Sequence, residues 1–339
     1  MNAFLETHNL SKHFGLRRSV AELLLRRNKR KIRAVDGVDF SLSEGKSLGV
    51  VGESGCGKTT LGKLIVRLQS PTAGKILFRG TDISDMNGAN LKSYRRQAQM
   101  IFQNPYNSIN PRFTIHDFIA EPLIIHDIGD NGDRTQRVKE ILHQVNLNPP
   151  EEFTNKYAHQ LSGGERQRAV VARALILNPD FLVADEPASM LDVSLRAGLL
   201  DLMDRMASQL DLTVLYISHD LSLVRYMCDR IMIMYLGKVV EEGEADQIIS
   251  DPRHPYTQAL VAAVPVPDPD FEYEQVNIKG MVPSVPEEEI SGCIFADRCP
   301  YSEEICTDRE PEPTTTLRKD HLVYCHLADS DKVRRRGAK

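Results

Sequence analysis

Short apolar runs alternate along the chain with longer segments of helical periodicity. Residues 46–51 are strand-like, and a glycine-rich turn and a helical pattern over residues 58–68 follow them. Residues 181–184 and 213–217 are continuous apolar runs of strand length, which is typical of central strands covered on both faces. The alternation predicts an α/β fold with a largely parallel sheet flanked by helices.

Each of these three apolar runs is followed directly by polar residues or by glycines. The first leads into the glycine-rich turn, the second into Asp185 and Glu186, and the third into Ser218 and His219. In open α/β sheets, ligands bind at the carboxyl edge of the strands. The pattern therefore predicts that three strands deliver polar groups to one crevice.

Two regions depart from this alternation. Residues 88–160 are richer in helical pattern and in Asn and Pro, which predicts an inserted helical subdomain. After residue 264, prolines form a linker-like segment, and four of the six cysteines crowd into residues 293–325. We therefore predict a main domain over residues 1–263 and a C-terminal extension, a linker with a small cysteine-rich module, over residues 264–339.

Composition narrows the class of protein. The chain has 339 residues, of which 41% are hydrophobic and 26% charged, which is an ordinary globular balance. No apolar stretch approaches the roughly 18 residues that span a bilayer, and the start has no signal-peptide pattern, so we expect a cytoplasmic protein. A net charge of −5 argues against general nucleic-acid binding.

One stretch is locally basic. Residues 17–33 hold eight Lys and Arg against one acid. The stretch is either a solvated hairpin loop or a contact for anionic lipid or a membrane partner.

Residues 52–59 match the pattern G-x-x-x-x-G-K-[ST], with a strand before it and a helix after it. Small residues let successive backbone N–H groups converge on phosphate oxygens, and the helix N-terminus adds positive potential. Lys58 would reach the β- and γ-phosphates, and Thr59 would ligate Mg²⁺. The nucleotide-binding residues expected here are Gly52, Ser54, Gly55, Cys56, Gly57, Lys58, Thr59 and Thr60, with Cys56 alternatively a small space-filling residue.

The acid pair Asp185–Glu186 can divide the work of phosphoryl transfer. Asp185 would hold the Mg²⁺ shell, and Glu186 would orient and polarise the attacking water. The alternative is an acid pair solvated at a strand end. His219 could contact the γ-phosphate, although a lone histidine is more often a satisfied core or surface group than a ligand contact.

The segment LSGGERQRA, residues 161–169, predicts the start of a helix. Ser162 followed by Glu165 just before an apolar run is a capping box. A simple cap requires neither the pair Gly163–Gly164 nor three charges, so we expect this helix end to face a ligand.

The ordered set GESGCGKTT, Gln103, LSGGERQR, FLVADEP, SMLD and ISHD resembles the ATP-binding-cassette (ABC) ATPase family over residues 1–263. The resemblance implies a P-loop NTPase cassette with an N-terminal antiparallel β subdomain and an inserted helical subdomain. It also implies roles for particular side chains. Phe14 would contact adenine, Gln103 the Mg²⁺ ion, and Asp192 the nucleotide held between two cassettes. Ser162, Gly163 and Gly164 would face the γ-phosphate of ATP held by a second cassette.

Three further segments resemble the ATPase subunits of oligopeptide and dipeptide importers: QNPYNSINPR (103–112), HPYTQAL (254–260) and GCIFADRC (292–299). The resemblance implies a peripheral protein at the cytoplasmic face of the inner membrane. Its partners would be two permease subunits, a second, non-identical cassette, and an external substrate-binding protein. Met190 stands where this family would have alanine, so oligosaccharide, nickel or glutathione uptake stays open.

Cys293, Cys299, Cys306 and Cys325 are separated by five, six and eighteen residues. Cysteines in a cytoplasmic chain favour metal over structural disulfides, and the C-x₂₋₄-C pairs of zinc sites are missing. The importer resemblance implies a [4Fe–4S] cluster here, with His326 as a possible substitute ligand. Zinc, or free thiols in a loosely ordered tail, are the alternatives.

Two other classes of protein fit the sequence less well. ABC ATPases that act on DNA carry long coiled-coil insertions, and those that act on ribosomes carry two cassettes in one chain, whereas this sequence shows neither. A structural metal-binding module with an idle nucleotide fold would not need Lys58, Asp185, Glu186 and His219.

Overall fold

The structure is a computed structural model that describes residues 3–15, 31–104, 108–264, 278–280, 290–315 and 320–330. The chain forms two compact units. The first unit comprises residues 1–42, 47–84 and 218–339, and the second comprises residues 43–46 and 85–217. The described part of the C-terminal extension thus belongs to the same compact unit as the glycine-rich loop at residues 52–57.

The first unit contains most of the strands and its helices are short. In chain order its elements are β1 (Leu5–Gly15), β2 (Lys31–Leu42), β3 (Ser47–Val51), α2 (Lys58–Ile65), β4 (Ala73–Phe78), β5 (Thr81–Asp82), α10 (Leu221–Met227), β9 (Arg230–Tyr235), β10 (Lys238–Glu244), α11 (Ala245–Ser250), α12 (Pro255–Ala262), α13 (Glu304–Asp308), β11 (Thr314–Thr315) and β12 (Leu322–Val323).

Four of these strands form an antiparallel sheet in the order β2-β1-β4-β5. In β1, Leu5 pairs with Leu42 of β2 and with Phe78 of β4, and all three side chains are buried. Burial of such alternating apolar positions on one face holds the register, because a slip of one residue would turn every apolar side chain outward. This sheet is the N-terminal antiparallel β subdomain that the sequence predicts.

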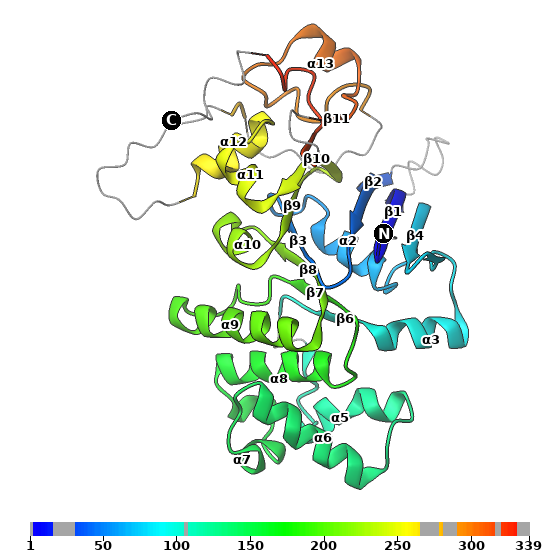
Figure 1. The fold of residues 1–339 in the computed structure, drawn as a ribbon, viewed down its shortest axis with the longest axis vertical. Helices are drawn as coiled ribbons and strands as arrows, with labels where there is room; N and C mark the ends of the chain where they lie inside the picture. Colours follow the sequence, from blue (N-terminus) through cyan, green and yellow to red (C-terminus); the bar gives the residue numbers. More distant parts are fainter. Residues whose placement is uncertain are drawn as a thin grey trace, which may run out of the picture. The chain divides into compact units, whose positions relative to one another are not determined.

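A second set of strands in the first unit carries the glycine-rich loop. β3 pairs in parallel with β9, and β9 pairs antiparallel with β10. The C-terminal extension, orange to red in Figure 1, joins this set because β12 pairs with β10 and β11 pairs with β12. A buried hydrogen bond between His321 Nε2 and Glu241 Oε1, at 2.7 Å, fixes the extension at the same place.

The second unit is mainly helical around three parallel strands. Its elements are α3 (Gly88–Gln97), β6 (Ala98–Ile101), α5 (Ile115–Ile125), α6 (Asn131–Gln144), α7 (Pro150–Thr154), the 3₁₀ helix η1 (Ala158–Gln160), α8 (Gly163–Leu175), β7 (Phe181–Asp185), α9 (Val193–Leu210) and β8 (Thr213–Ser218). β7 pairs in parallel with both β6 and β8. All five residues of β7 are buried, as its unbroken apolar run predicts.

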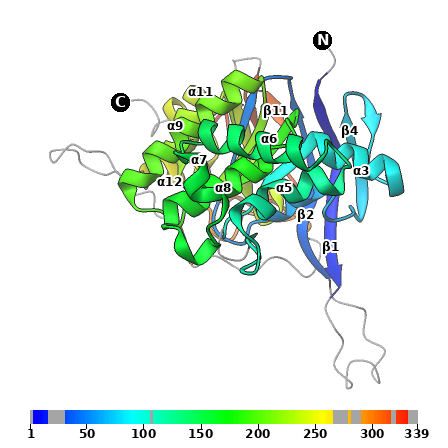
Figure 2. The same cartoon turned by 90° about the horizontal axis from the view of Figure 1, so that it is seen from below.

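The helices α5, α6, α7 and α8 gather into one group, green in Figures 1 and 2. Arg173 of α8 fastens α5 to α8. Its NH2 nitrogen lies 2.8 Å from Glu121 Oε2, and its guanidinium lies 5.1 Å from the centre of the Phe118 ring. Capping boxes begin α5 at Thr114 and α6 at Asp130. These helices bear out the helical character predicted for residues 88–160, with β6 as the one strand among the described residues of that range.

The predicted α/β cassette fold is confirmed, with two qualifications. The helix predicted over residues 58–68 ends at Ile65, because Arg67 takes a left-handed conformation with φ of 55°. Several sequence predictions fall outside the described residues: most of the basic stretch at 17–33, most of the proline-rich linker, and the basic tail at 331–339.

Candidate functional site

The glycine-rich loop of residues 52–57 links the end of β3 to the start of α2. Gly57 caps α2 in a left-handed conformation with φ of 107°, and Lys58 is the first residue of the helix. The Gly237 N–H donates to Cys56 O at 2.9 Å, and the Asp36 N–H donates to Gly237 O at 2.9 Å. The turn between β9 and β10 therefore ties the loop to β2.

Packing explains two of the three loop glycines. A Cβ on Gly52 would lie 2.2 Å from Met234 O, and one on Gly57 would lie 2.0 Å from Ala34 O. Gly55 meets no atom within 4 Å but has φ of 82°, which favours glycine. The loop thus combines close backbone contacts at both ends with an open, exposed middle, where backbone N–H groups can meet a ligand.

The side chain of Lys58 bends back to the glycine-rich loop that precedes it. Its Nζ donates to Gly52 O at 2.6 Å and to Glu53 O at 2.9 Å, and the residue is only 5% exposed. Two carbonyl oxygens thus stabilise an ammonium that burial alone would disfavour. The loop wraps around a positive charge, as an anion-binding loop requires.

Cys56 is a buried neighbour of this lysine. It is 3% exposed, and burial raises the pKa of its thiol. Its sulfur lies 2.7 Å from the Cβ position of Gly52. This packing agrees with the alternative reading of Cys56 as a small space-filling residue.

Thr59 and Thr60 are half-buried in the first turn of α2, and Ser54 is exposed. Phe14, near the end of β1, leaves 36% of its surface exposed, and Lys12 Nζ lies 5.4 Å from the centre of its ring. An exposed aromatic face at this position can stack on a planar base.

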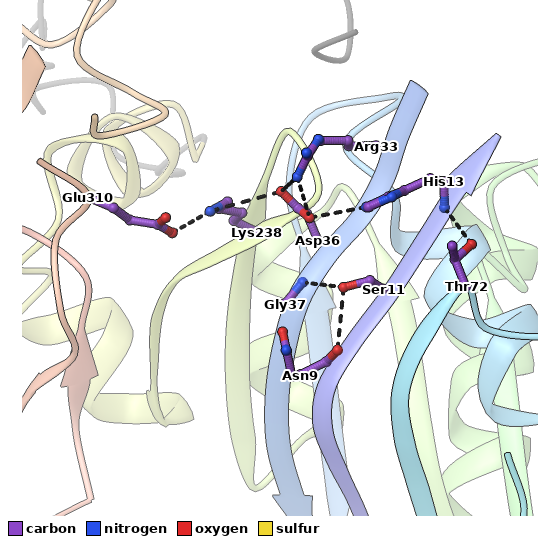
Figure 3. A network of polar contacts seen from close by, with 9 residues as sticks. All are labelled: Asn9, Ser11, His13, Arg33, Asp36, Gly37, Thr72, Lys238 and Glu310. Atoms are coloured by element: carbon purple, nitrogen blue, oxygen red, sulfur yellow. Dashed lines mark hydrogen bonds and ion pairs between the residues drawn. The ribbon is translucent and has the colours of Figure 1, made fainter. Parts of the chain in front are cut away.

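A polar network supports the strand that carries Phe14 (Figure 3). Asp36 of β2 accepts a hydrogen bond from Arg33 at 3.2 Å, and His13 Nε2 lies 3.2 Å from Asp36 Oδ1. Lys238 Nζ stands 4.0 Å from Asp36 Oδ2 and pairs with Glu310 of the C-terminal extension. The network therefore connects β1, β2, β10 and the extension.

In the second unit, the acid pair ends a fully buried strand. Asp185 is 3% exposed, whereas Glu186 turns out of the strand with φ of 45°. The Glu186 N–H donates to Ile217 O at 2.9 Å, which fixes this turn against the end of β8. Gln103 Nε2 donates to Glu186 Oε2 at 2.7 Å, so two residues singled out from the sequence lie in direct contact.

The predicted capping box at the start of α8 is confirmed. Glu165 N–H donates to Ser162 Oγ at 3.3 Å, and Ser162 N–H donates to Glu165 Oε2 at 2.8 Å. The hydrogen bonds from the hydroxyl and the N–H of Ser162 lower the pKa of Glu165. Buried Arg166 donates to Ala158 O at 2.7 Å and holds the preceding chain. Gly163 and Gly164 form the first turn of α8.

Two candidate residues lie at element ends. Asp192 is exposed and directly precedes α9, and its side chain makes no capping hydrogen bond to that helix. His219 is exposed just after β8, and Asp220 beside it caps α10 by accepting from Ser222 N–H at 3.0 Å.

The four cysteines of the extension lie near one another but not in a metal-binding arrangement. Burial, and then the neighbouring thiols of Cys293, Cys299 and Cys306, raise the pKa of Cys325 to about 12. Within the described residues, no group of three or more His, Cys, Asp or Glu side chains could hold a metal ion. His326 Nε2 instead lies 2.7 Å from Arg309 O.

The predicted [4Fe–4S] cluster is therefore not supported. The physical reason is that, among the described residues, no three of the four thiols come together as a group that could hold a metal ion.

Comparisons with known proteins decide the family. The family model described as ABC transporter matches residues 35–189, and that of the oligopeptide/dipeptide transporter C-terminal region matches residues 240–306. The oligopeptide transport ATP-binding protein AppF of Bacillus subtilis is 44% identical over 95% of this chain and 97% of its own. The chain belongs to the ABC transporter family.

Other relatives agree with this assignment. The dipeptide transport ATP-binding protein DppF of Escherichia coli K12 is 40% identical over 97% of this chain and 95% of its own length. The solved dimeric structure of the ATP-binding cassette MJ0796, bound to ADP and Pi, matches with a TM-score of 0.62 and 27% identity. That match covers 71% of this chain and 98% of the solved chain.

This ABC ATPase has no described helix that is long and apolar enough to cross a membrane. It also has two residues at the glycine-rich loop that sequence reasoning did not single out. Tyr256 Oη accepts from Glu53 N–H at 2.9 Å, and Arg298 NH1 donates to Glu53 Oε2 at 2.9 Å. Both residues lie in segments that resemble peptide-importer subunits, and that resemblance was the only signal that could have drawn attention to them.

Proposed function

We propose that this chain is the ATP-hydrolysing motor subunit of an importer for oligopeptides or dipeptides. The observation that carries the proposal is the C-terminal region, where residues 240–306 match the oligopeptide/dipeptide transporter model and include the segments HPYTQAL and GCIFADRC. Relatives named as peptide transport ATP-binding proteins share 40 to 44% identity with almost the whole chain.

We propose that the glycine-rich loop binds the phosphates of ATP. Lys58 would exchange the loop carbonyls for the β- and γ-phosphate oxygens, and backbone N–H groups of residues 54–60 would complete the cradle. The exposed ring of Phe14 would cover the adenine. Thr59, Gln103 and Asp185 would hold Mg²⁺, which supplies charge neutralisation for the leaving phosphate.

Glu186 is the proposed general base. Its carboxylate would take a proton from the attacking water, and the amide of Gln103 would orient that carboxylate through the hydrogen bond already present. His219 would contact the γ-phosphate with its exposed ring.

We propose that hydrolysis requires a second cassette. The α8 N-terminus carries positive partial charge on its unpaired N–H groups, and Ser162, Gly163 and Gly164 would present it to ATP bound by the partner. Asp192 would lie at the seam between the two cassettes. The partner cassette would be a non-identical relative of this chain. An ATPase assay of this chain mixed with such a relative tests this point.

The other partners are two permease subunits and an external substrate-binding protein, which place this chain at the cytoplasmic face of the membrane.

The decisive experiment reconstitutes the full complex in vesicles and measures ATPase activity and uptake. Dipeptides, longer peptides and oligosaccharides are each presented with their binding protein. Stimulation by peptides alone supports the proposal, and stimulation by oligosaccharides alone overturns the substrate class.

The predicted [4Fe–4S] cluster does not enter this proposal, because the described thiols form no metal site. Analysis of anaerobically prepared protein tests this conclusion. Iron and labile sulfide in stoichiometric amounts would restore the cluster to Cys293, Cys299, Cys306 and Cys325. Zinc at one per chain, or no metal, would exclude it.

A further inference from the structure

Glu53, in the middle of the glycine-rich loop, is held from both its main chain and its side chain. Its N–H donates to Tyr256 Oη at 2.9 Å. Its carboxylate receives a fork from Arg298, with NH1 2.9 Å from Oε2 and NH2 3.3 Å from Oε1. A two-point contact between guanidinium and carboxylate fixes orientation as well as distance.

Arg298 is largely withdrawn from water. Its side chain is 10% exposed and that of Glu53 is 26% exposed. Arg298 NH1 also lies 3.4 Å from Tyr235 Oη, and its guanidinium stands 5.6 Å from the centre of the Tyr235 ring. Because the pair is mostly shielded, breaking it costs more than breaking a surface ion pair, whose contribution is small.

An aromatic cluster anchors the chain around Arg298. Phe295, three residues earlier, packs on Tyr235 and Tyr256 with ring centres 5.2 and 5.6 Å apart, and on His254 at 5.4 Å. Phe295, Tyr235 and Tyr256 are each at most 1% exposed. The segment that carries Arg298 is therefore packed firmly against β9 and α12.

A second link ties the extension to the other side of the loop. Glu310 pairs with Lys238, whose Nζ stands 4.0 Å from Asp36 Oδ2 (Figure 3). Asp36 lies two residues after Ala34, the residue whose carbonyl faces the Cβ position of Gly57. The extension thus contacts the loop at Glu53 and, through Lys238, the strand beside the end of the loop.

We propose that Arg298 is a positioning residue for ATP binding, which holds Glu53 so that the glycine-rich loop keeps its nucleotide-accepting shape. Arg298 touches no atom that reacts and acts through Glu53. On this view the cysteine-rich extension is part of the nucleotide site. The opposing view is that the Arg298–Glu53 pair only attaches the extension to the rest of the chain.

The test is steady-state ATPase kinetics of the full complex, together with equilibrium binding of a fluorescent ATP analogue to the full-length chain. Arg298→Ala is expected to raise KM and Kd for ATP about tenfold, equivalent to about 1.4 kcal/mol, with kcat changed less than about twofold. Arg298→Lys should recover only part of the affinity, because an ammonium cannot form the fork. Arg309→Ala is the matched control, since Arg309 is an exposed arginine of the extension paired with Glu312.

A double-mutant cycle with Glu53→Gln and Arg298→Gln tests whether Arg298 affects nucleotide affinity through Glu53. If the two residues act together, the double variant loses no more affinity than either single variant. Unchanged KM in Arg298→Ala and Glu53→Gln would overturn the proposal, as would equal losses in Arg309→Ala. If Arg298→Ala does not fold, Arg298→Lys and Glu53→Gln carry the test.

The inference rests on the nucleotide site proposed above, and one further variant separates the two. Lys58→Ala should abolish nucleotide binding altogether. Normal binding in Lys58→Ala would refute the proposed site itself, whereas lost binding there with normal binding in Arg298→Ala would refute only the role of Arg298.

Discussion

The side-chain amide of Gln103 donates a 2.7 Å hydrogen bond to Glu186 Oε2, although 83 residues separate them in the chain. Gln103 comes two residues after β6 and Glu186 directly after β7, and these strands are parallel neighbours. Their carboxyl ends therefore meet at one edge of the sheet. The contact couples the segment after β6 to the proposed base.

Replacing Glu186 by Gln should stop hydrolysis while leaving ATP binding intact. The amide is nearly isosteric but cannot accept the water proton, and such a base contributes about 10²- to 10⁴-fold in rate. We expect ATPase activity to fall at least about 100-fold, and light scattering to show a dimer that persists with ATP and Mg²⁺. Turnover at the wild-type rate would remove Glu186 from the mechanism.

Gly57→Ala should destabilise the protein much more than Gly80→Ala. Both positions have positive φ, 107° and 75°, but a Cβ on Gly57 would overlap Ala34 O at 2.0 Å, whereas one on Gly80 meets nothing within 4 Å. Left-handed strain alone costs about 1–2 kcal/mol. We therefore expect about 1 kcal/mol for Gly80→Ala and at least about 3 kcal/mol for Gly57→Ala in urea unfolding. Equal losses would contradict the packing argument.

Ser162→Ala and Thr114→Ala remove equivalent capping boxes, at α8 and α5. Each should cost about 1 kcal/mol of stability. Only Ser162→Ala should also lower ATPase activity, since only α8 is proposed to face nucleotide. A loss of activity with both variants would show that stability, and not contact with ATP, is responsible.

The same caps give a pH signature. Hydrogen bonds from the Ser162 and Thr114 side chains lower the pKa of Glu165 and Asp117. Their contribution is thus present above the unfolded pKa of about 4 and is lost as pH falls through the lower folded value. The difference between the unfolding midpoints of the wild type and each variant should narrow as pH falls below about 4. It should not vanish, because the hydrogen bonds from backbone N–H groups to the two hydroxyls do not depend on pH. A gap that stayed constant down to pH 3 would rule out this linkage.

His254 should make the protein sensitive to mild acid. Its ring is 1% exposed and accepts from Tyr256 N–H at 3.1 Å, and burial lowers its pKa from 6.5 to about 3. Between these values the unfolded chain binds a proton that the folded chain does not, so stability falls as pH decreases from 6.5. His254→Asn keeps an acceptor for the cap and should flatten this loss. Parallel urea midpoints for both proteins from pH 7 to 4.5 would show the idea to be wrong.

Features set by neighbouring residues were predictable from the sequence. The capping box at Ser162 and the glycine-rich loop depend on contacts within a few residues, and both were found. The fully buried strand β7 was predicted from its unbroken apolar run, because a strand covered on both faces has apolar residues at successive positions.

Other features of the structure could not be predicted from neighbouring residues. α2 ends in a Schellman arrangement, in which Leu68 N–H donates to Lys63 O and Arg67 N–H to Leu64 O, yet the left-handed position is an arginine where glycine is usual. The contacts of Glu53 with Tyr256 and Arg298 span 203 and 245 residues, so no window of sequence contains both partners. The [4Fe–4S] cluster was expected from four cysteines and the importer resemblance, and neither of these shows how the thiols are arranged in space.

The hydroxyl of Ser162 has one proton, and in this structure Oγ donates it to Glu165 Oε2 at 2.7 Å. An anion arriving at the start of α8 cannot receive that proton until the carboxylate gives it up. If a phosphate binds there as proposed, Ser162 must exchange one acceptor for another, and the negative charge of Glu165 competes with that of the arriving phosphate.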